Sequence, residues 1–112
     1  MGTRINMDGK ISYPPTNKQQ VIELIQINKQ DIEKFGAERI GIFGSFARNE
    51  QNEESDVDLI VEFKLGMKKY RNYLNLADFL EAKLERKVDL LTWESMASFV
   101  QREVRKEIEY IS

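Results

Sequence analysis

Two aspartates separated by one residue are the feature of this sequence that most strongly suggests chemistry. Asp56 and Asp58 begin a segment in which apolar residues occupy alternate positions up to Phe63, a pattern typical of a strand with one buried face. On a helix the two acids would lie ~200° apart, whereas on a strand they share a face with their Cα atoms ~6.6 Å apart. The alternation therefore predicts that both carboxylates can approach one cation.

Carboxylate pairs of this kind suit divalent metal ions. Hard oxygen ligands bind Mg²⁺, and two carboxylates can bridge ions ~3.5–4 Å apart, as in two-metal phosphoryl-transfer sites. Asp89 is a third candidate, because it lies between Val88 and Leu90 and faces away from the core that these neighbours fill. Converging carboxylates raise one another's pKa unless cations, protons or basic partners compensate them. Because the chain has no histidine, we favour bound metal.

The dipeptide Gly44-Ser45 is a candidate phosphate site. It follows an Ile-rich segment, residues 39–43, and precedes what reads as a short helix through Arg48. Glycine lets a phosphate approach the backbone, and the following amides and the Ser45 hydroxyl can donate to phosphate oxygens. A hydroxyl activated by Asp89 or by a metal could then attack the α-phosphate, with pyrophosphate as the leaving group. These residues predict transfer of a nucleoside monophosphate.

The composition narrows the possible chemistry. The 112 residues include no cysteine and no histidine, which excludes disulfides, thiolate or imidazole zinc sites and Ser-His-Asp triads. A formal net charge of -2 predicts no strong nucleic-acid binding, and no apolar run approaches the ~20 residues that span a bilayer. We therefore expect a cytoplasmic protein, without membrane attachment, whose chemistry depends on carboxylates.

The elements that position these groups follow from periodicity and turn residues. Residues 1–15 show no period and include Pro14-Pro15, so we expect a loose N-terminal extension before a single domain over 16–112. The first predicted helix begins with a capping box at Thr16 and Gln19 and ends at Gly36, a second helix covers 70–84, and a last helix is capped by Thr92 and includes Ile108 and Ile111. Strands are predicted over 39–43, 56–63 and 87–91. This order predicts an α/β (α+β) fold, with helices on one face of a small mixed sheet and an open acidic face.

At its motifs the chain resembles the minimal nucleotidyltransferases of the DNA polymerase beta superfamily, whose mark is Gly-Ser, ten residues, then Asp-x-Asp. The matching segments are Phe43-Gly44-Ser45-Phe46-Ala47-Arg48, Ser55-Asp56-Val57-Asp58-Leu59 and Val88-Asp89-Leu90. The spacing matches without a gap, and the resemblance covers residues 17–112. Asn49 stands where the family usually has glycine. Because Asn tolerates left-handed backbone better than other non-glycine residues, we expect the turn to survive.

The resemblance implies the nucleotidyltransferase fold and a magnesium-dependent transfer of a nucleotide. Asp56, Asp58 and Asp89 would be the catalytic residues and the ligands of a pair of Mg²⁺ ions, with ATP as the nucleotide donor. The residues implied in nucleotide binding are Gly44, Ser45, Arg48 and Ser55. Small members resemble antitoxins that pair with a HEPN-domain toxin and transfer AMP to a tyrosine of that partner. We therefore expect AMP transfer to a hydroxyl of a partner protein.

Other interpretations of the same residues stay open. The chain could be a catalytically weak antitoxin that neutralises its partner by forming a complex, or a subunit of a small-molecule nucleotidyltransferase. Asp56 and Asp58 could be solvated acids of an edge strand, and Asp89 could pair with Lys87 or Arg86. Each of these interpretations predicts a different surrounding for the carboxylates.

Two basic features also have alternative meanings. Arg48 could contact phosphate or pair with Glu53, Glu54 or a sheet carboxylate. A basic cluster follows the second strand and consists of Lys64, Lys68, Lys69 and Arg71. Such a run usually marks a solvated loop, but it could also contact the nucleotide or a partner.

Overall fold

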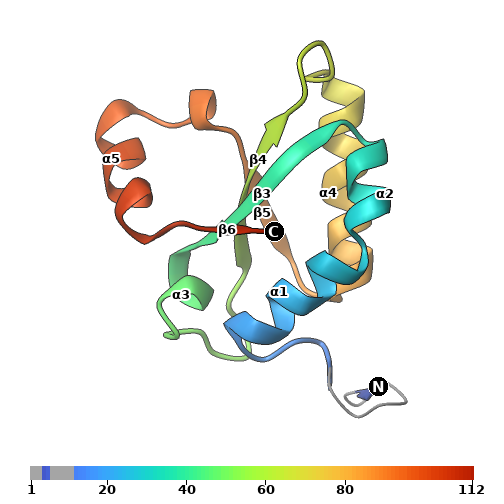
Figure 1. The fold of residues 1–112 in the computed structure, drawn as a ribbon. Coiled ribbons are helices and arrows are strands. Elements are labelled where there is room, and N and C mark those ends of the chain that lie inside the picture. The colour runs from blue at the N-terminus through green and yellow to red at the C-terminus, as the bar shows by residue number, and fades with distance from the viewer. Residues whose placement is uncertain (1–3, 6–11) are drawn as a thin grey trace.

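The computed structural model describes residues 4–5 and 12–112 (Figure 1). Near the N-terminus, β1 (Arg4–Ile5) and β2 (Ser12–Tyr13) pair antiparallel. Pro15, which the predicted domain boundary assigns to the extension, is fully buried. Among the described residues, no helix has the length and apolar character needed to cross a membrane.

A four-stranded mixed sheet forms the centre of the domain, in the order β5-β4-β3-β6. Its strands are β3 (Ala37–Phe43), β4 (Val57–Phe63), β5 (Val88–Leu91) and β6 (Glu109–Ile111). β4 and β5 run parallel, whereas β3 is antiparallel to both β4 and β6. The predicted small mixed sheet is therefore confirmed, with one additional edge strand.

Three helices cover one face of the sheet: α1 (Lys18–Ile27), α2 (Lys29–Lys34) and α4 (Tyr70–Leu84) (Figure 1). The main core lies between this face and the three helices. Every second residue of β4 points into it, because successive side chains of a strand alternate between the two faces of the sheet. The buried residues at its centre include Val21, Leu24, Ile42, Val57, Leu59, Val61, Leu76, Leu80 and Leu84. The predicted helix over 70–84 is confirmed, because its apolar positions recur along one side.

The opposite face is covered in part, because α5 (Ser98–Glu107) packs over its middle (Figure 1). A second, smaller core forms there from Phe43, Ile60 and Val104. A short turn of helix, η1 (Trp93–Ser95), connects β5 to α5. The acidic face is thus open over a narrower area than predicted.

The start of the first helix differs from the prediction by one residue. Asn17 is the N-cap, and its side chain accepts a hydrogen bond of 2.9 Å from the backbone N–H of Gln20. Gln20 Oε1 in turn accepts from the backbone N–H of Thr16 at 2.7 Å. The predicted box at Thr16 and Gln19 was therefore wrong, because Asn17 is an equally good cap and Gln20 reaches back to complete the pair. The single helix predicted up to Gly36 is interrupted at Asn28, which is the C-cap of α1 and the N-cap of α2. Gly36 follows the end of α2 at φ +94°, in the left-handed region expected of a glycine that ends a helix.

The last helix begins later and ends earlier than predicted. Thr92 precedes only the short turn η1 and makes no side-chain cap hydrogen bond there, and α5 begins at Ser98 after Ala97. It stops at Glu107, and Glu109–Ile111 instead pair with β3 as strand β6. The helical assignment of Ile108 and Ile111 was wrong, because β3 offers an open edge and Tyr110 and Ile111 favour strand geometry. Ile111 packs against the main core.

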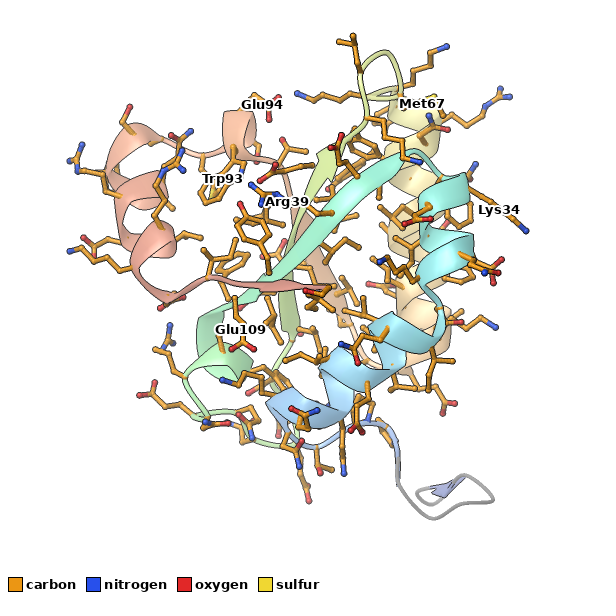
Figure 2. All side chains as sticks on the ribbon, viewed as in Figure 1. Lys34, Arg39, Met67, Trp93, Glu94 and Glu109 are labelled. Carbon is orange, nitrogen blue, oxygen red and sulfur yellow. The ribbon has the colours of Figure 1, made fainter. Side chains whose placement is uncertain are left out.

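Glu62 joins β6 to the rest of the sheet. Its carboxylate accepts hydrogen bonds from the Tyr110 hydroxyl at 2.6 Å, Trp93 Nε1 at 2.8 Å and Arg39 Nε at 3.0 Å. Burial opposes its charge, but these donors outweigh burial and hold the pKa of Glu62 below its ordinary value. Figure 2 shows Trp93 and Arg39 on the side of the sheet that faces α5. The network thus fixes β3, β4, β6 and η1 together.

We expect Gly41→Ala to lower the free energy of unfolding by about 1–3 kcal/mol, the usual cost of overpacking a filled core. An ideal Cβ on Gly41 would lie 2.6 Å from Ile108 Cδ1 and 3.2 Å from Tyr110 Cδ1. Urea denaturation measures the loss. Ile108→Ala removes both Cδ1 and Cγ1, which would lie 2.6 and 2.8 Å from that Cβ, so Gly41→Ala should cost less in this background. Equal costs in both backgrounds would contradict this packing account.

Candidate active site

Two of the predicted aspartates lie side by side in the structure. The parallel register of β4 and β5 pairs Asp58 with Asp89, and paired residues on neighbouring strands point to the same face. Asp56 comes directly before β4, two residues ahead of Asp58. Asp58 is partly buried, whereas Asp56 and Asp89 are exposed. The fold therefore brings all three carboxylates to one end of the sheet.

The carboxylate of Asp58 lies in an anion-rich environment. Burial, together with the charges of Asp89 and Asp56, raises its pKa from 3.8 to about 6. The nearby charge of Arg48 opposes the shift only in part. The repulsion among these acids is the kind that a cation relieves.

Oxygen ligands of this type fit a hard divalent cation such as Mg²⁺. In the described part of the chain, however, no group of three or more Asp, Glu, His or Cys side chains is gathered closely enough to hold a metal ion. The three aspartates are neighbours rather than a closed cage. Their role as metal ligands stays a prediction.

Gly44 explains why the Gly-Ser turn lies against these acids. It ends β3 and begins α3 (Gly44–Ala47) with φ +75°, in the left-handed region that favours glycine. An ideal Cβ at Gly44 would collide with Oδ2 of Asp58, whose Cα partner on β3 is Phe43. The intervening segment leaves β3 and returns as β4. The Gly-Ser turn and Asp58 are therefore in contact, although ten residues separate Gly44-Ser45 from Asp56 in the sequence.

Arg48 and Gly44 share a partner that the sequence did not reveal. Glu107, the last residue of α5, accepts a hydrogen bond from the backbone N–H of Gly44 at 2.7 Å. Arg48 Nη1 donates to both oxygens of Glu107, at 3.0 and 3.2 Å, and its Nε donates to Glu50 at 2.9 Å. The structure therefore pairs Arg48 with Glu107 and Glu50 rather than with Glu53 or Glu54. No spacing rule could have indicated a partner from α5.

The remaining nucleotide-binding candidates lie on either side of the loop between α3 and β4. Ser45 is partly buried in the first turn of α3. Ser55 Oγ accepts from the backbone N–H of Asn52 at 2.8 Å, so its hydroxyl shapes the loop directly before Asp56. Asn49 adopts φ +58°, which confirms that asparagine supports the left-handed turn.

The alternative basic partners lie elsewhere. Arg86 donates to backbone carbonyls rather than to Asp89. The basic cluster follows Phe63, at the opposite end of β4 from Asp58, and Lys68 within it pairs with Glu94 at 2.6 Å. The structure therefore does not bring this cluster to the three carboxylates.

Comparison with known proteins identifies the family. The family model of the nucleotidyltransferase domain matches residues 21–111, which is most of the chain. The chain belongs to this nucleotidyltransferase family. The expected family and fold are thereby confirmed, and the enzyme class is an adenylyltransferase-like nucleotidyltransferase.

This nucleotidyltransferase is similar to characterised and solved proteins. It is 33% identical over 94 residues to the protein adenylyltransferase MntA of Thermococcus cleftensis, covering 83% of this chain and 94% of that protein. A solved candidate minimal nucleotidyltransferase shares 28% identity with a TM-score of 0.73, over 84% of this chain and 95% of that one. A chain from the complex of a tri-AMPylated Shewanella oneidensis HEPN toxin with its MNT antitoxin shares the fold at 22% identity and a TM-score of 0.52, over 78% and 71% of the chains.

We expect Glu107→Gln to tighten ATP binding by this nucleotidyltransferase. Glu107 holds Arg48 and the Gly44 N–H, which are donors that a triphosphate could use. Because solvent screens an exposed ion pair, its loss should lower the dissociation constant only modestly, by up to about fivefold. Calorimetry with a non-hydrolysable ATP analogue measures it. Glu50→Gln, which removes the other partner of Arg48, is the matched control, and weaker binding by Glu107→Gln would contradict the expectation.

Proposed function

We propose that this nucleotidyltransferase transfers AMP from ATP to a hydroxyl group of a partner protein, as the antitoxin of a HEPN-domain toxin in the cytoplasm. The observation that carries the proposal is the packing of Gly44 against Asp58, with Asp89 beside it on the parallel strand. The name of the relative MntA, a protein adenylyltransferase, supports the chemistry. The solved complex of an AMPylated HEPN toxin with an MNT antitoxin supports the kind of partner.

The proposed mechanism gives the aspartates and the residues of the Gly-Ser turn separate tasks. Asp56, Asp58 and Asp89 would hold Mg²⁺, which neutralises triphosphate charge and activates a bound hydroxyl. Ser45 and Arg48 would hold the phosphate oxygens, because both lie at the turn that Gly44 makes between β3 and α3. Such contacts would orient the α-phosphate toward the attacking hydroxyl.

AMP transfer would form one bond to the α-phosphorus and break another. The acceptor oxygen bonds to the α-phosphorus while the bond from that phosphorus to the bridging oxygen breaks, and pyrophosphate leaves. Asp89 can take the proton of the acceptor hydroxyl, because its side chain is exposed at the site. Exposure of Asp56 and Asp89 also leaves the acceptor side open to a large partner.

Labelled ATP tests this function directly. The protein is incubated with Mg²⁺, a HEPN-domain protein as the candidate acceptor, and ATP labelled at the α-phosphate. Label should appear on a tyrosine of the partner, and ATP labelled at the γ-phosphate should leave none, which distinguishes AMP transfer from phosphorylation. Unchanged labelling by Asp56→Asn would overturn the proposal.

One observation favours a second candidate function, neutralisation by complex formation alone. Glu107 already occupies the Gly44 N–H and Arg48, and this competition would weaken nucleotide binding. Under this alternative, neutralisation of the toxin should survive Asp56→Asn. Substitutions in Tyr110 or Ile111 discriminate poorly, because both residues hold the sheet together.

A further inference from the structure

The guanidinium of Arg86 connects three segments that are distant in the sequence. Its Nε donates to the carbonyl of Pro15 at 2.7 Å, and its Nη1 donates to the carbonyls of Glu53 and Ser55, both at 3.1 Å. The guanidinium carbon also lies 5.1 Å from the centroid of the Phe46 ring. Arg86 therefore joins the backbone that precedes α1 to the backbone that precedes Asp56, and it does not pair with a carboxylate in these contacts.

The segment that Arg86 holds leads directly into the first aspartate. Residues 49–55 connect α3 to β4, and Ser55 precedes Asp56. Within this loop, local hydrogen bonds to Asn52 and Ser55 side chains shape the turn but do not attach it to the domain. At its start the loop is attached to α3, because the Glu50 N–H donates to the Ser45 carbonyl at 2.9 Å and the Glu50 carboxylate accepts from Arg48. Farther along the loop, Gln51 Nε2 donates to the Thr16 carbonyl at 3.1 Å, and Arg86 holds the carbonyls of Glu53 and Ser55.

The position of Arg86 is itself well defined. Glu85 ends α4 in the left-handed region at φ +54°, which turns the chain toward β5. The carbonyl of Lys87, the residue after Arg86, accepts a hydrogen bond from the backbone N–H of Val57 at 2.9 Å. The turn between α4 and β5 thus holds two neighbouring segments. The Arg86 side chain holds the loop, and the Lys87 backbone holds the start of β4, directly before β5 and its Asp89.

The residue type suits this task. Arginine presents several N–H donors in a rigid plane, so one side chain can join carbonyls of separate segments, whereas lysine has a single flexible ammonium group. Pro15, the anchor on the far side, and Phe46, beneath the guanidinium, are both fully buried. Arg86 therefore ties the loop to a fixed part of the domain.

We propose that Arg86 is a positioning residue of the active site, which fixes the backbone that presents Asp56 beside Asp58. The proposal rests on the proposed function, because it takes Asp56 to be a metal ligand. Arg86 touches none of the reacting groups and acts through the loop carbonyls. Its loss should thus loosen the loop and weaken metal binding without unfolding the domain.

Hydrogen exchange of the full-length protein tests the loop. In Arg86→Ala, amides of residues 49–57 should exchange at least tenfold faster, while those of α4 keep their rates. Arg86→Lys should behave like Arg86→Ala, and Lys87→Ala, a change at the exposed neighbouring cation, should match the unmodified protein. Unchanged exchange in the loop would overturn the proposal, as would faster exchange spread evenly over the whole domain.

A thermal shift titration with Mn²⁺ tests the consequence for the metal. Metal should raise the melting temperature of the unmodified protein, and Arg86→Ala should need about 10–100-fold more Mn²⁺ for the same rise, as when other supports of metal ligands are removed. Identical titrations would overturn the role of Arg86. If Mn²⁺ does not stabilise even the unmodified protein, the proposed function fails, and the hydrogen exchange still decides whether Arg86 holds the loop.

Discussion

Asp58→Asn is expected to abolish AMP transfer and, at the same time, to make the metal-free protein more stable. Loss of transition-state charge stabilisation worth several kcal/mol corresponds to a decrease of at least ~100-fold in the transfer rate. The gain in stability follows from crowding, because Asp58 is partly buried and faces the charges of Asp89 and Asp56. The neutral amide of asparagine has nearly the same shape and removes both the cost of burying a charge and the repulsion from Asp89 and Asp56.

The sign of the pH dependence follows from the raised pKa of Asp58. The folded-state pKa of about 6 exceeds the unconstrained value of 3.8, so ionisation of Asp58 disfavours the folded state. This cost is absent below the unfolded pKa, grows as the pH rises through the folded pKa, and is complete above it. Allowing for solvent screening of a half-exposed group, Asn should stabilise by about 1 kcal/mol at neutral pH.

Thermal denaturation in EDTA at neutral pH and near pH 4 measures the effect. The advantage of Asp58→Asn should be present at neutral pH and shrink near pH 4. Asp56→Asn is the matched control, because Asp56 is exposed and its replacement should lose activity with a smaller gain in stability. Retained activity in Asp58→Asn would contradict its catalytic assignment, and reduced stability would contradict the account of charge crowding.

Gly44→Ala is expected to cost about 3 kcal/mol of folding free energy and to remove activity, as the sum of a backbone cost of ~1–2 kcal/mol and an overpacking cost of ~1–3 kcal/mol. Gly44 adopts φ +75°, and a Cβ there would collide with Asp58 Oδ2. Either the turn or the carboxylate must move. Both changes disturb the proposed site.

Gly66 provides a control that separates the two costs. It adopts a similar φ of +80°, but a Cβ there would meet no atom within 4 Å. Gly66→Ala should therefore cost only the ~1–2 kcal/mol of left-handed backbone. Urea denaturation compares the two variants, and a Gly44→Ala, Asp58→Ala double variant should recover part of the difference. Equal losses at Gly44 and Gly66 would show that the collision with Asp58 is unimportant.

Segments whose signal is local were predictable from the sequence. The helix over Tyr70–Leu84 and the strand β4 follow from periodicity that arises within a single element. The first cap was displaced by one residue because Thr16 and Asn17 are both good caps, and only the chain path selects between them. Strand β6 could not be predicted, because a three-residue strand depends on a neighbour rather than on its own propensity.

The chemical character of the candidate site follows from the order of residues in one segment. Asp56, Asp58 and their spacing from Gly44-Ser45 are properties of one continuous segment, and alternation in a strand sets which face the acids share. The prediction that Asp89 lies beside these acids was weaker, because the register between two strands cannot be derived from the sequence of either strand alone. The structure supplied that register by pairing Asp58 with Asp89.

The side chains that support these acids come from distant parts of the chain and are identified by the fold. Glu107 reaches Gly44 and Arg48 from α5, and Arg86 reaches the loop before Asp56 from the turn between α4 and β5. Contacts of this kind join segments far apart in the chain, so no local pattern of residues encodes them. The carboxylates could therefore be named from the sequence, whereas their surroundings required the fold.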